Sequence, residues 1–198
     1  MLYAIAHYLR DRMPWLWDLV DAVNSLLFSL LYGRKLAVVE EAVIKKYNEV
    51  TGYKVCRLRE VDTARIADFF VKQPEEAYTY FKPHRFDEKS IRKLQMNQSF
   101  LAYLLVDEDR IAGYCFNRSF FHGKGFRGRM VDVDHRGKGL GTAMNKILNE
   151  VGFGIGLRLF ESVSKDNVAS YRSAMSASNV RVVKEMPHNE VYLELLPE

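Results

Sequence analysis

The segment best suited to chemistry is the glycine-rich turn Arg136-Gly137-Lys138-Gly139-Leu140-Gly141, which follows an apolar strand-like run and leads into an amphipathic helical pattern. The first turn of a helix has free backbone N–H groups and the positive end of the helix dipole, so it attracts anions. Gly139 and Gly141 let the main chain approach a diphosphate without a Cβ in the way. Arg136 and Lys138 add positive charge. We therefore predict a diphosphate-binding turn.

Two common phosphate-binding motifs do not fit this turn. A nucleotide-binding P-loop requires Gly-Lys-Ser or Gly-Lys-Thr after a four-residue gap, and the Rossmann fingerprint requires three glycines in its own spacing within repeated βαβ units. The segment meets neither condition. The sequence therefore does not indicate either of these nucleotide-binding folds.

The turn and the elements around it resemble those of a known superfamily. Val131-x-Val133-x-x-Arg136-Gly-Lys-Gly-Leu-Gly141-Thr-Ala-Met144 resembles the acetyl-CoA-binding motif of the GNAT acetyltransferases, which reads Arg or Gln, two residues, Gly, one residue, then Gly or Ala. A strand ending at Val163, followed by Ser164-Lys-Asp-Asn167 and a helix, is similar to that family's second motif. The resemblance implies the GNAT acyltransferase fold, an α/β (α+β) fold with a central mixed, mostly antiparallel sheet flanked by helices.

The resemblance also implies that acetyl-CoA is the acyl donor, and it assigns positions to this ligand. Main-chain amides of the turn would hold the diphosphate, main-chain groups of Val131 and Val133 would bind the pantetheine arm, and Asn167 would contact the same arm. Asn167 is equally suited to cap the following helix. No metal is expected, because Cys56 and Cys115 lack metal-ligand spacing. The residues expected at the cofactor are Val131, Val133, Arg136, Gly137, Lys138, Gly139, Leu140, Gly141, Thr142 and Asn167.

Acetyl transfer to an amine needs a base that accepts a proton and a donor that supports the developing oxyanion. Main-chain amides near Val133 are the expected oxyanion donors. Glu161 is the first candidate for the base, because it lies inside the apolar run 157–163, where burial makes a carboxylate a stronger base. The alternative for Glu161 is a salt bridge to Arg129 or Arg158. Asp132, on the expected cofactor strand, is the second candidate.

The general acid is less clear from the sequence. In many GNAT enzymes a Tyr about seven residues after the Asn of the second motif acts as the acid, and that position here is Ala174. Tyr171, nearly one turn earlier, is the candidate substitute. The family's common Gly-Phe ending is also absent, since Ser178-Asn179 stand there. The resemblance therefore supports cofactor binding and leaves the proton path open.

An aromatic segment before the predicted sheet is the candidate site for the amine. Tyr80, Phe81 and His84 lie in a segment, residues 75–93 with Pro74 and Pro83, that is expected to cap a cleft, and their rings could stack on a sugar or an aromatic acceptor. The alternative is that these rings pack the helices against the sheet. We predict an N-acetyltransferase acting on a small-molecule amine such as an amino sugar. The alternatives are a peptide or protein N-acetyltransferase and a non-catalytic acyl-CoA-binding regulatory module.

The elements that must position these residues follow from hydrophobic periodicity. Residues 1–50 are predicted to form an N-terminal helical extension, with one helix beginning at Pro14 and ending at Gly33 and another over residues 38–47. Residues 51–198 form the predicted GNAT acetyltransferase domain. Its expected strands are 53–59, an antiparallel meander of 100–106, 111–121 and 126–133, and then 157–163, 180–183 and 191–196; its main helices are 61–70, 140–151 and 167–178.

Composition and charge limit the partners. The chain has 198 residues, of which 48% are hydrophobic and 27% charged, and a net charge of +4 with scattered basic residues, so nucleic-acid binding is not expected. The uncharged stretch 22–33 is too short to span a membrane, and the first residues lack the features of a secretory signal. We expect a cytoplasmic protein. The apolar face of the extension could cover the domain, form a homodimer, or lie on a membrane surface beside Arg34 and Lys35.

Overall fold

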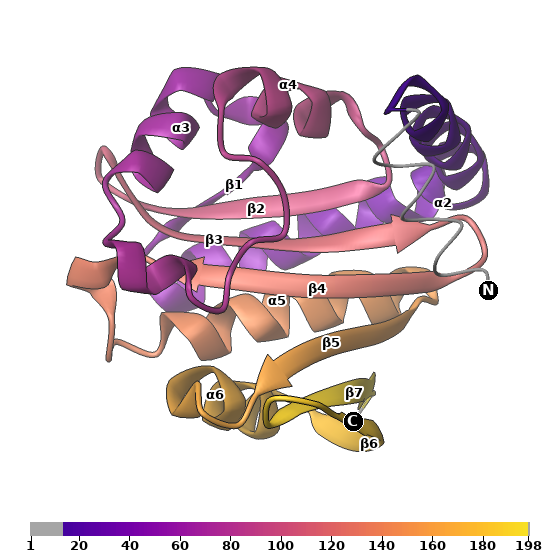
Figure 1. Cartoon of the computed structure of the whole chain (residues 1–198). Coiled ribbons are helices and arrows are strands. Elements are labelled where there is room, and N and C mark those ends of the chain that lie inside the picture. The colour runs from indigo at the N-terminus through magenta and orange to yellow at the C-terminus, as the bar shows by residue number, and fades with distance from the viewer. Residues whose placement is uncertain (1–13, 198) are drawn as a thin grey trace.

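The computed structural model describes residues 14–197 and contains a mixed seven-stranded sheet, with its strands in the order β1-β2-β3-β4-β5-β7-β6 (Figure 1). All neighbouring strands are antiparallel except β4 and β5, which are parallel. The expected mixed, mostly antiparallel sheet is therefore confirmed. The strands are β1 Lys54–Arg57, β2 Phe100–Asp107, β3 Arg110–Phe120, β4 Lys124–Val131, β5 Arg158–Ser164, β6 Asn179–Met186 and β7 Glu190–Leu196.

Helices cover both faces of the sheet, and each face has its own apolar cluster. Helices α2 and α5 pack on one face, whereas α3 and α4 pack on the other (Figure 1). Because β2 lies between both clusters, its residues are apolar and buried from Phe100 to Val106. A third, smaller cluster joins α6 to β5 and β7. The helices are α2 Pro14–Thr51, α3 Thr63–Val71, α4 Glu88–Met96, α5 Leu140–Ile155 and α6 Val168–Ala177.

The predicted meander is present as β2, β3 and β4, with Asp107–Arg110 forming the tight connection between the first two strands. The strand that precedes the glycine-rich turn ends earlier than expected. It stops at Val131, and residues Val133–His135 form a single 3₁₀ turn instead of continuing the strand. The Asp132 side chain accepts a hydrogen bond from the Asp134 amide at 3.1 Å, which stabilises this turn.

The N-terminal extension differs from the prediction. From Pro14 to Thr51 the chain forms one continuous helix, so the predicted helix end at Gly33 is wrong. A glycine inside a helix costs about 1 kcal/mol relative to alanine. Packing on either side offsets this cost, because Phe28 before the glycine and Leu36 after it are both buried in the cluster that α2 shares with α5. Tertiary packing therefore outweighs the local signal.

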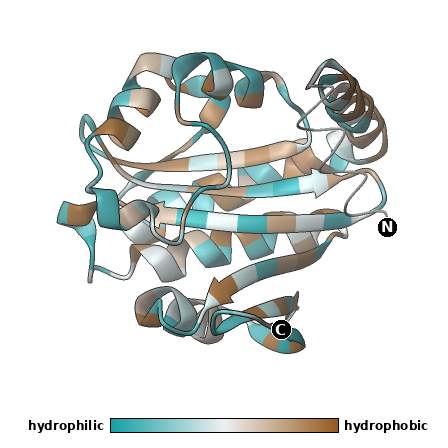
Figure 2. Cartoon of the chain, in the orientation of Figure 1, coloured by the Kyte–Doolittle hydropathy of each residue, from teal (hydrophilic) through white to brown (hydrophobic). Residues whose placement is uncertain are grey.

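Helix α2 has one packed face and one exposed apolar face. Asn24 fixes the packed face through hydrogen bonds to Ser99 Oγ, the Ser119 carbonyl and the Phe121 amide, at 2.8 to 3.0 Å. By length and composition alone α2 could also cross a membrane. Figure 2 shows the hydrophobic colour along its N-terminal half. The large exposed apolar residues in this half are Trp15, Leu19, Val20, Val23, Leu26, Leu30 and Leu31.

Two substitutions in α2 distinguish these faces. Phe28 is 0% exposed and Leu30 is 74% exposed. We expect Phe28→Ala to lower the free energy of unfolding by about 3–5 kcal/mol, because it leaves a cavity in the core. Leu30→Ala should change it by less than about 0.5 kcal/mol. Urea unfolding of both variants measures the difference, and equal effects would contradict this docking of α2.

Candidate functional site

The site begins where β4 and β5 separate. These parallel strands are paired only through Lys124–Arg158, Gly125–Leu159 and Phe126–Phe160. Beyond Phe126 the rest of β4 has no partner on this side, and Figure 1 shows β5 turning away from it. A V-shaped gap therefore opens toward the glycine-rich turn, between two strands that each remain paired on their other side.

Main-chain groups of β4 face this gap. The Asp132 amide donates to the Ala112 carbonyl at 2.9 Å, which fixes which residues of β4 bond to β3. Because the hydrogen-bonding direction alternates along an antiparallel strand, Arg129 and Val131 direct their main-chain N–H and C=O groups into the gap. The Val133 amide is already used, since Gln73 Oε1 accepts from it at 3.3 Å. Of the two valines expected at the cofactor, Val131 has the free main-chain groups.

The glycine-rich turn lies at the open end of the gap and forms the start of α5. Gly139 is the N-cap of that helix and has a φ of 79°, a left-handed conformation that favours glycine. The amides of Thr142 and Ala143 both donate to the Gly139 carbonyl, each at 3.1 Å. The amides of Leu140 and Gly141, in the first turn, have no partner within the helix. The turn therefore presents free N–H groups where an anion is favoured.

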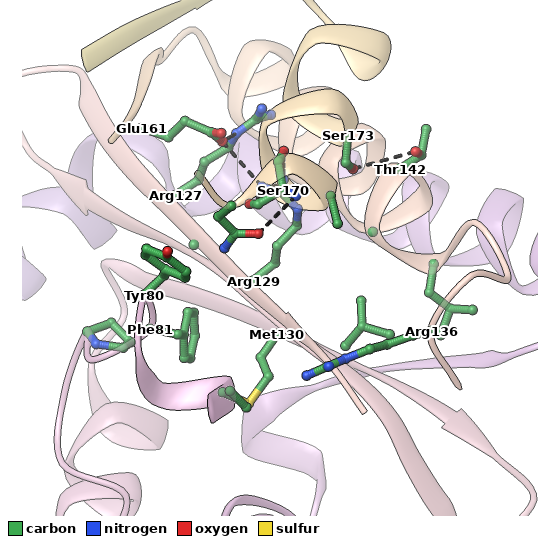
Figure 3. Close-up of a pocket in the computed structure, with 18 of the residues that line it drawn as sticks. Tyr80, Phe81, Arg127, Arg129, Met130, Arg136, Thr142, Glu161, Ser170 and Ser173 are labelled. Carbon is green, nitrogen blue, oxygen red and sulfur yellow. Dashed lines mark hydrogen bonds and ion pairs between the residues drawn. The ribbon is translucent and has the colours of Figure 1, made fainter. Parts of the chain in front are cut away.

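One cavity of about 760 Å³ connects the turn to the aromatic segment. Figure 3 shows Arg136 at one end of it, Tyr80 and Phe81 at the other, and Arg129 between them. Lys138 and Val133 do not line this cavity. Of the residues predicted at the cofactor, those that line it are Val131, Arg136, Gly137, Gly139, Leu140, Gly141, Thr142 and Asn167.

A buried ionic cluster forms one wall of the cavity. Glu161 Oε2 accepts from Arg127 Nε in a short contact and from Arg129 Nη1 at 3.4 Å. All three side chains are at most 7% exposed. Glu161 Oε1 and Arg127 Nη2 have no hydrogen-bond partner in the part of the chain that the structure describes. The salt bridge expected for Glu161 is thus present with Arg129 and also with Arg127, whereas Arg158 pairs with Glu194.

The second predicted base is engaged elsewhere. Asp132 is buried but does not line the cavity, and its carboxylate accepts from Gln73 Nε2 at 2.8 Å and contacts His135 Nδ1 at 2.9 Å. Burial alone would raise the pKa of Asp132, but the hydrogen bonds from His135 and Gln73 outweigh burial and hold this pKa below its usual value. Because the Asp132 carboxylate does not line the cavity, this geometry gives no support to a catalytic role for Asp132.

Helix α6 directs serines, and not its tyrosine, at the cavity. Tyr171 packs against the cluster formed with β5 and β7, and Ala174 is fully buried. Asn167, Ser170 and Ser173 line the cavity instead. Asn167 also caps α6, since its Oδ1 accepts from the Ser170 amide at 3.2 Å. The geometry therefore gives no support to Tyr171 as the acid.

The three predicted acceptor residues have different surroundings. Tyr80, which is 53% exposed, and Phe81 both line the cavity. His84 does not line it; its Nε2 lies 2.8 Å from the Tyr114 hydroxyl, inside a cluster of aromatic rings that includes Phe70 and Phe86. His84 therefore packs within the protein, as the alternative interpretation expected. Tyr80 and Phe81 remain the residues predicted to stack on the acceptor.

Ser170 and Gln73 were not predicted as parts of the site. Arg127 and Arg129 alternate along β4, and two arginines on one face of a strand are a visible signal of a buried ionic partner. Gln73 and Ser170 carry no comparable signal. Their roles depend on contacts 59 and 41 residues away along the chain, with Asp132 and Arg129.

The environment of His84 predicts a pH dependence of stability. Burial lowers the pKa of His84, and this outweighs the opposing contact with the Arg85 carbonyl. Its folded pKa is therefore below the unfolded value, so the stability it contributes is present above about pH 6.5 and is lost as pH falls further, by at most about 1.4 kcal/mol per pH unit. Urea unfolding at pH 7.5 and 5.5 should show a smaller loss for His84→Gln than for the wild type.

The exposed His122→Gln variant controls for the loss of one imidazole and should retain the wild-type loss. An equal loss in His84→Gln and in the wild type would contradict the lowered pKa of His84.

Comparison with known proteins identifies the fold. No protein-family model and no curated protein matches the sequence. The GNAT domain of S. lividans PAT is similar with a TM-score of 0.63 at 16% identity, over 72% of this chain and 89% of that one. A ribosomal-protein-S5-alanine acetyltransferase from Vibrio fischeri has a TM-score of 0.59 at 16% identity, over 72% and 91% of the two chains.

A third similar structure is AAC(6')-Ib in complex with paromomycin and acetyl-CoA, with a TM-score of 0.54 at 16% identity, over 71% of this chain and 91% of that one. The chain therefore has the fold of the GNAT acetyltransferases.

Proposed function

We propose that this protein is an N-acetyltransferase that moves an acetyl group from acetyl-CoA to the primary amine of a small molecule, such as an amino sugar. The main support for this function is the gap between β4 and β5, which opens at the free amides of the α5 N-terminus. A ligand with a diphosphate at one end and an extended, amide-containing arm at the other matches both features.

The donor would lie along the gap. Its diphosphate would bind the amides of Leu140 and Gly141 beside Arg136, and its pantetheine arm would hydrogen-bond to the main chain of Val131 and Arg129. The cavity is continuous from Arg136 to Glu161, so the thioester can reach the ionic cluster. The similar AAC(6')-Ib structure, which contains acetyl-CoA, supports this choice of donor.

The reaction would be direct attack of the neutral amine on the thioester carbonyl carbon. Glu161 is the proposed base, because its Oε1 has no hydrogen-bond partner within residues 14–197 and the side chain lines the cavity. Its other oxygen is held by Arg127 and Arg129, which fixes the orientation of the carboxylate. Main-chain amides that face the gap would support the oxyanion.

The acceptor would enter beside Tyr80 and Phe81. Similar structures include enzymes for an aminoglycoside and for a ribosomal protein, so the fold is compatible with both classes of acceptor. In this chain the segment Tyr80–Pro83 contributes part of the cavity wall, opposite the main chain of β4. A cavity bordered in this way by aromatic rings favours a compact acceptor over an extended peptide.

The donor is tested by calorimetric titration with acetyl-CoA. Arg136→Ala is expected to weaken binding about 10- to 100-fold, which is the loss of one charge-assisted contact. Lys146→Ala, at an exposed position on α5 outside the cavity, is the matched control and should change affinity less than threefold.

The acceptor is tested by measuring thiol release with amino sugars, polyamines and peptides. Absence of acetyl-CoA binding contradicts the donor, and turnover with peptides alone contradicts the small acceptor.

The proposed base is tested with Glu161→Gln and Glu161→Asp. The Gln variant removes the carboxylate and should lower kcat about 100-fold or more, as expected for loss of a general base. It also leaves two buried arginines without their counter-charge, which costs about 3–5 kcal/mol of stability, so kcat is measured below its unfolding temperature. The Asp variant keeps the charge. A kcat for folded Glu161→Gln within threefold of the wild type would exclude this role.

A further inference from the structure

The cavity-facing side of α6 contains hydroxyl groups in place of a phenol. Ser170 and Ser173 line the cavity, whereas Tyr171 lies in the apolar cluster with β5 and β7. Ala174 is fully buried. A phenolic acid from α6 is therefore not available to a thiol that leaves inside the cavity, and another group must meet the charge that develops on the sulfur.

Ser170 is oriented by an arginine. Arg129 Nη2 donates to Ser170 Oγ at 3.0 Å and to the Ser170 carbonyl at 2.8 Å. Because the Ser170 oxygen accepts from a guanidinium, its own O–H hydrogen must point elsewhere. No acceptor for that hydrogen is found among the residues described, and Ser170 borders the cavity. The contact with Arg129 thus leaves one polarised O–H donor available (Figure 3).

The same cluster has an excess of positive charge. One carboxylate, Glu161, faces two guanidinium groups, those of Arg127 and Arg129. The Arg129 side chain is 7% exposed, so its charge is only weakly screened by solvent. A second anion placed in this cluster would therefore be stabilised.

The position of this pair matches the path of the proposed donor. A Cβ built on Gly141, in the first turn of α5, would lie 3.9 Å from Arg129 Nε and 3.2 Å from Ser173 Oγ. Arg129 therefore lies between the free amides of the turn and Glu161 at the other end of the cavity. An arm that runs from the turn into the gap passes the Arg129–Ser170 pair.

We propose that Ser170 and Arg129 stabilise the thiolate that leaves from acetyl-CoA; this inference rests on the proposed function. The amine nitrogen forms the new C–N bond and gives its proton to the base, the C–S bond breaks, and the electron pair stays on sulfur as a thiolate. The Ser170 O–H donates to this thiolate and the buried charge of Arg129 stabilises it. Solvent protonates the thiolate when CoA is released.

The proposal predicts a lowered pKa for the thiol of bound CoA, because a neighbouring cation and a hydrogen-bond donor favour the thiolate. The experiment compares the affinities of CoA and desulfo-CoA by calorimetry from pH 6.5 to 9. For the wild type, the preference for CoA should rise with pH and exceed that of Ser170→Ala about tenfold, which corresponds to one unit of thiol pKa. No amine is needed, so the result does not depend on the acceptor.

Three further variants test the two side chains. Ser170→Thr keeps the hydroxyl and should retain the preference, whereas Arg129→Met should lose most of it. Ser176→Ala is the matched control, because Ser176 lies on the exposed side of α6 and outside the cavity. Circular dichroism and unfolding temperature establish that each variant is folded.

Two outcomes would overturn the proposal, and they can be told apart. If CoA and desulfo-CoA bind equally at every pH, or if Ser170→Ala keeps the wild-type preference, the thiolate site is refuted while the proposed function stands. If neither ligand binds, the proposed function fails as well. With an active acceptor, Ser170→Ala should also lower kcat about tenfold with little change in the KM for acetyl-CoA, since it removes an interaction made only as the thiolate forms.

Discussion

Strands β4 and β5 are paired over three residues and then separate, although both remain in one sheet. Main-chain groups left unpaired inside a protein must find other partners. An extended ligand that carries its own hydrogen-bonding groups would pair with the free edge of β4. The N-terminus of α5, at the open end of the gap, favours an anionic group at that end of such a ligand.

Several buried polar groups of the fold are left unsatisfied, and two of them lie at the cavity. Four buried side-chain atoms lack a hydrogen-bond partner within the described chain: Asn117 Oδ1, Arg127 Nη2, Asn145 Oδ1 and Glu161 Oε1. Of these four residues, Arg127 and Glu161 line the cavity. Each such group costs free energy. The two apolar clusters on the faces of the sheet offset that cost.

Local patterns were sufficient to predict most elements of the domain and the position of the glycine-rich turn at the start of α5. The meander, α5 and the strand that contains Glu161 each follow from the periodicity of a few neighbouring residues. The helix end predicted at Gly33 is wrong because the low helix propensity of one glycine is a small, local effect. Phe28 and Leu36, on either side of it, hold α2 together through contacts with α5 and the sheet. Burial of a helix face therefore outweighs the propensity of a single glycine.

Which side chains of α6 and of the segment after β4 face the cavity could not be predicted from sequence spacing. Tyr171 and Ser170 are neighbours, and only the docking of α6 determines which of them faces the cavity. The Asp132 carboxylate accepts a hydrogen bond from Gln73, and three strands separate these two residues along the chain. Long-range contacts of this kind fix the orientation of a side chain, and the sequence contains no local record of them.

If the gap between β4 and β5 holds the donor, a crystal structure of the complex with CoA should show the ligand inside it. The diphosphate should lie at the amides of Leu140 and Gly141, the pantetheine arm should hydrogen-bond to the main chain of Arg129 and Val131, and the sulfur should lie beside Ser170. CoA bound outside the gap, or with its phosphates on surface lysines and its arm in solvent, would refute this binding mode.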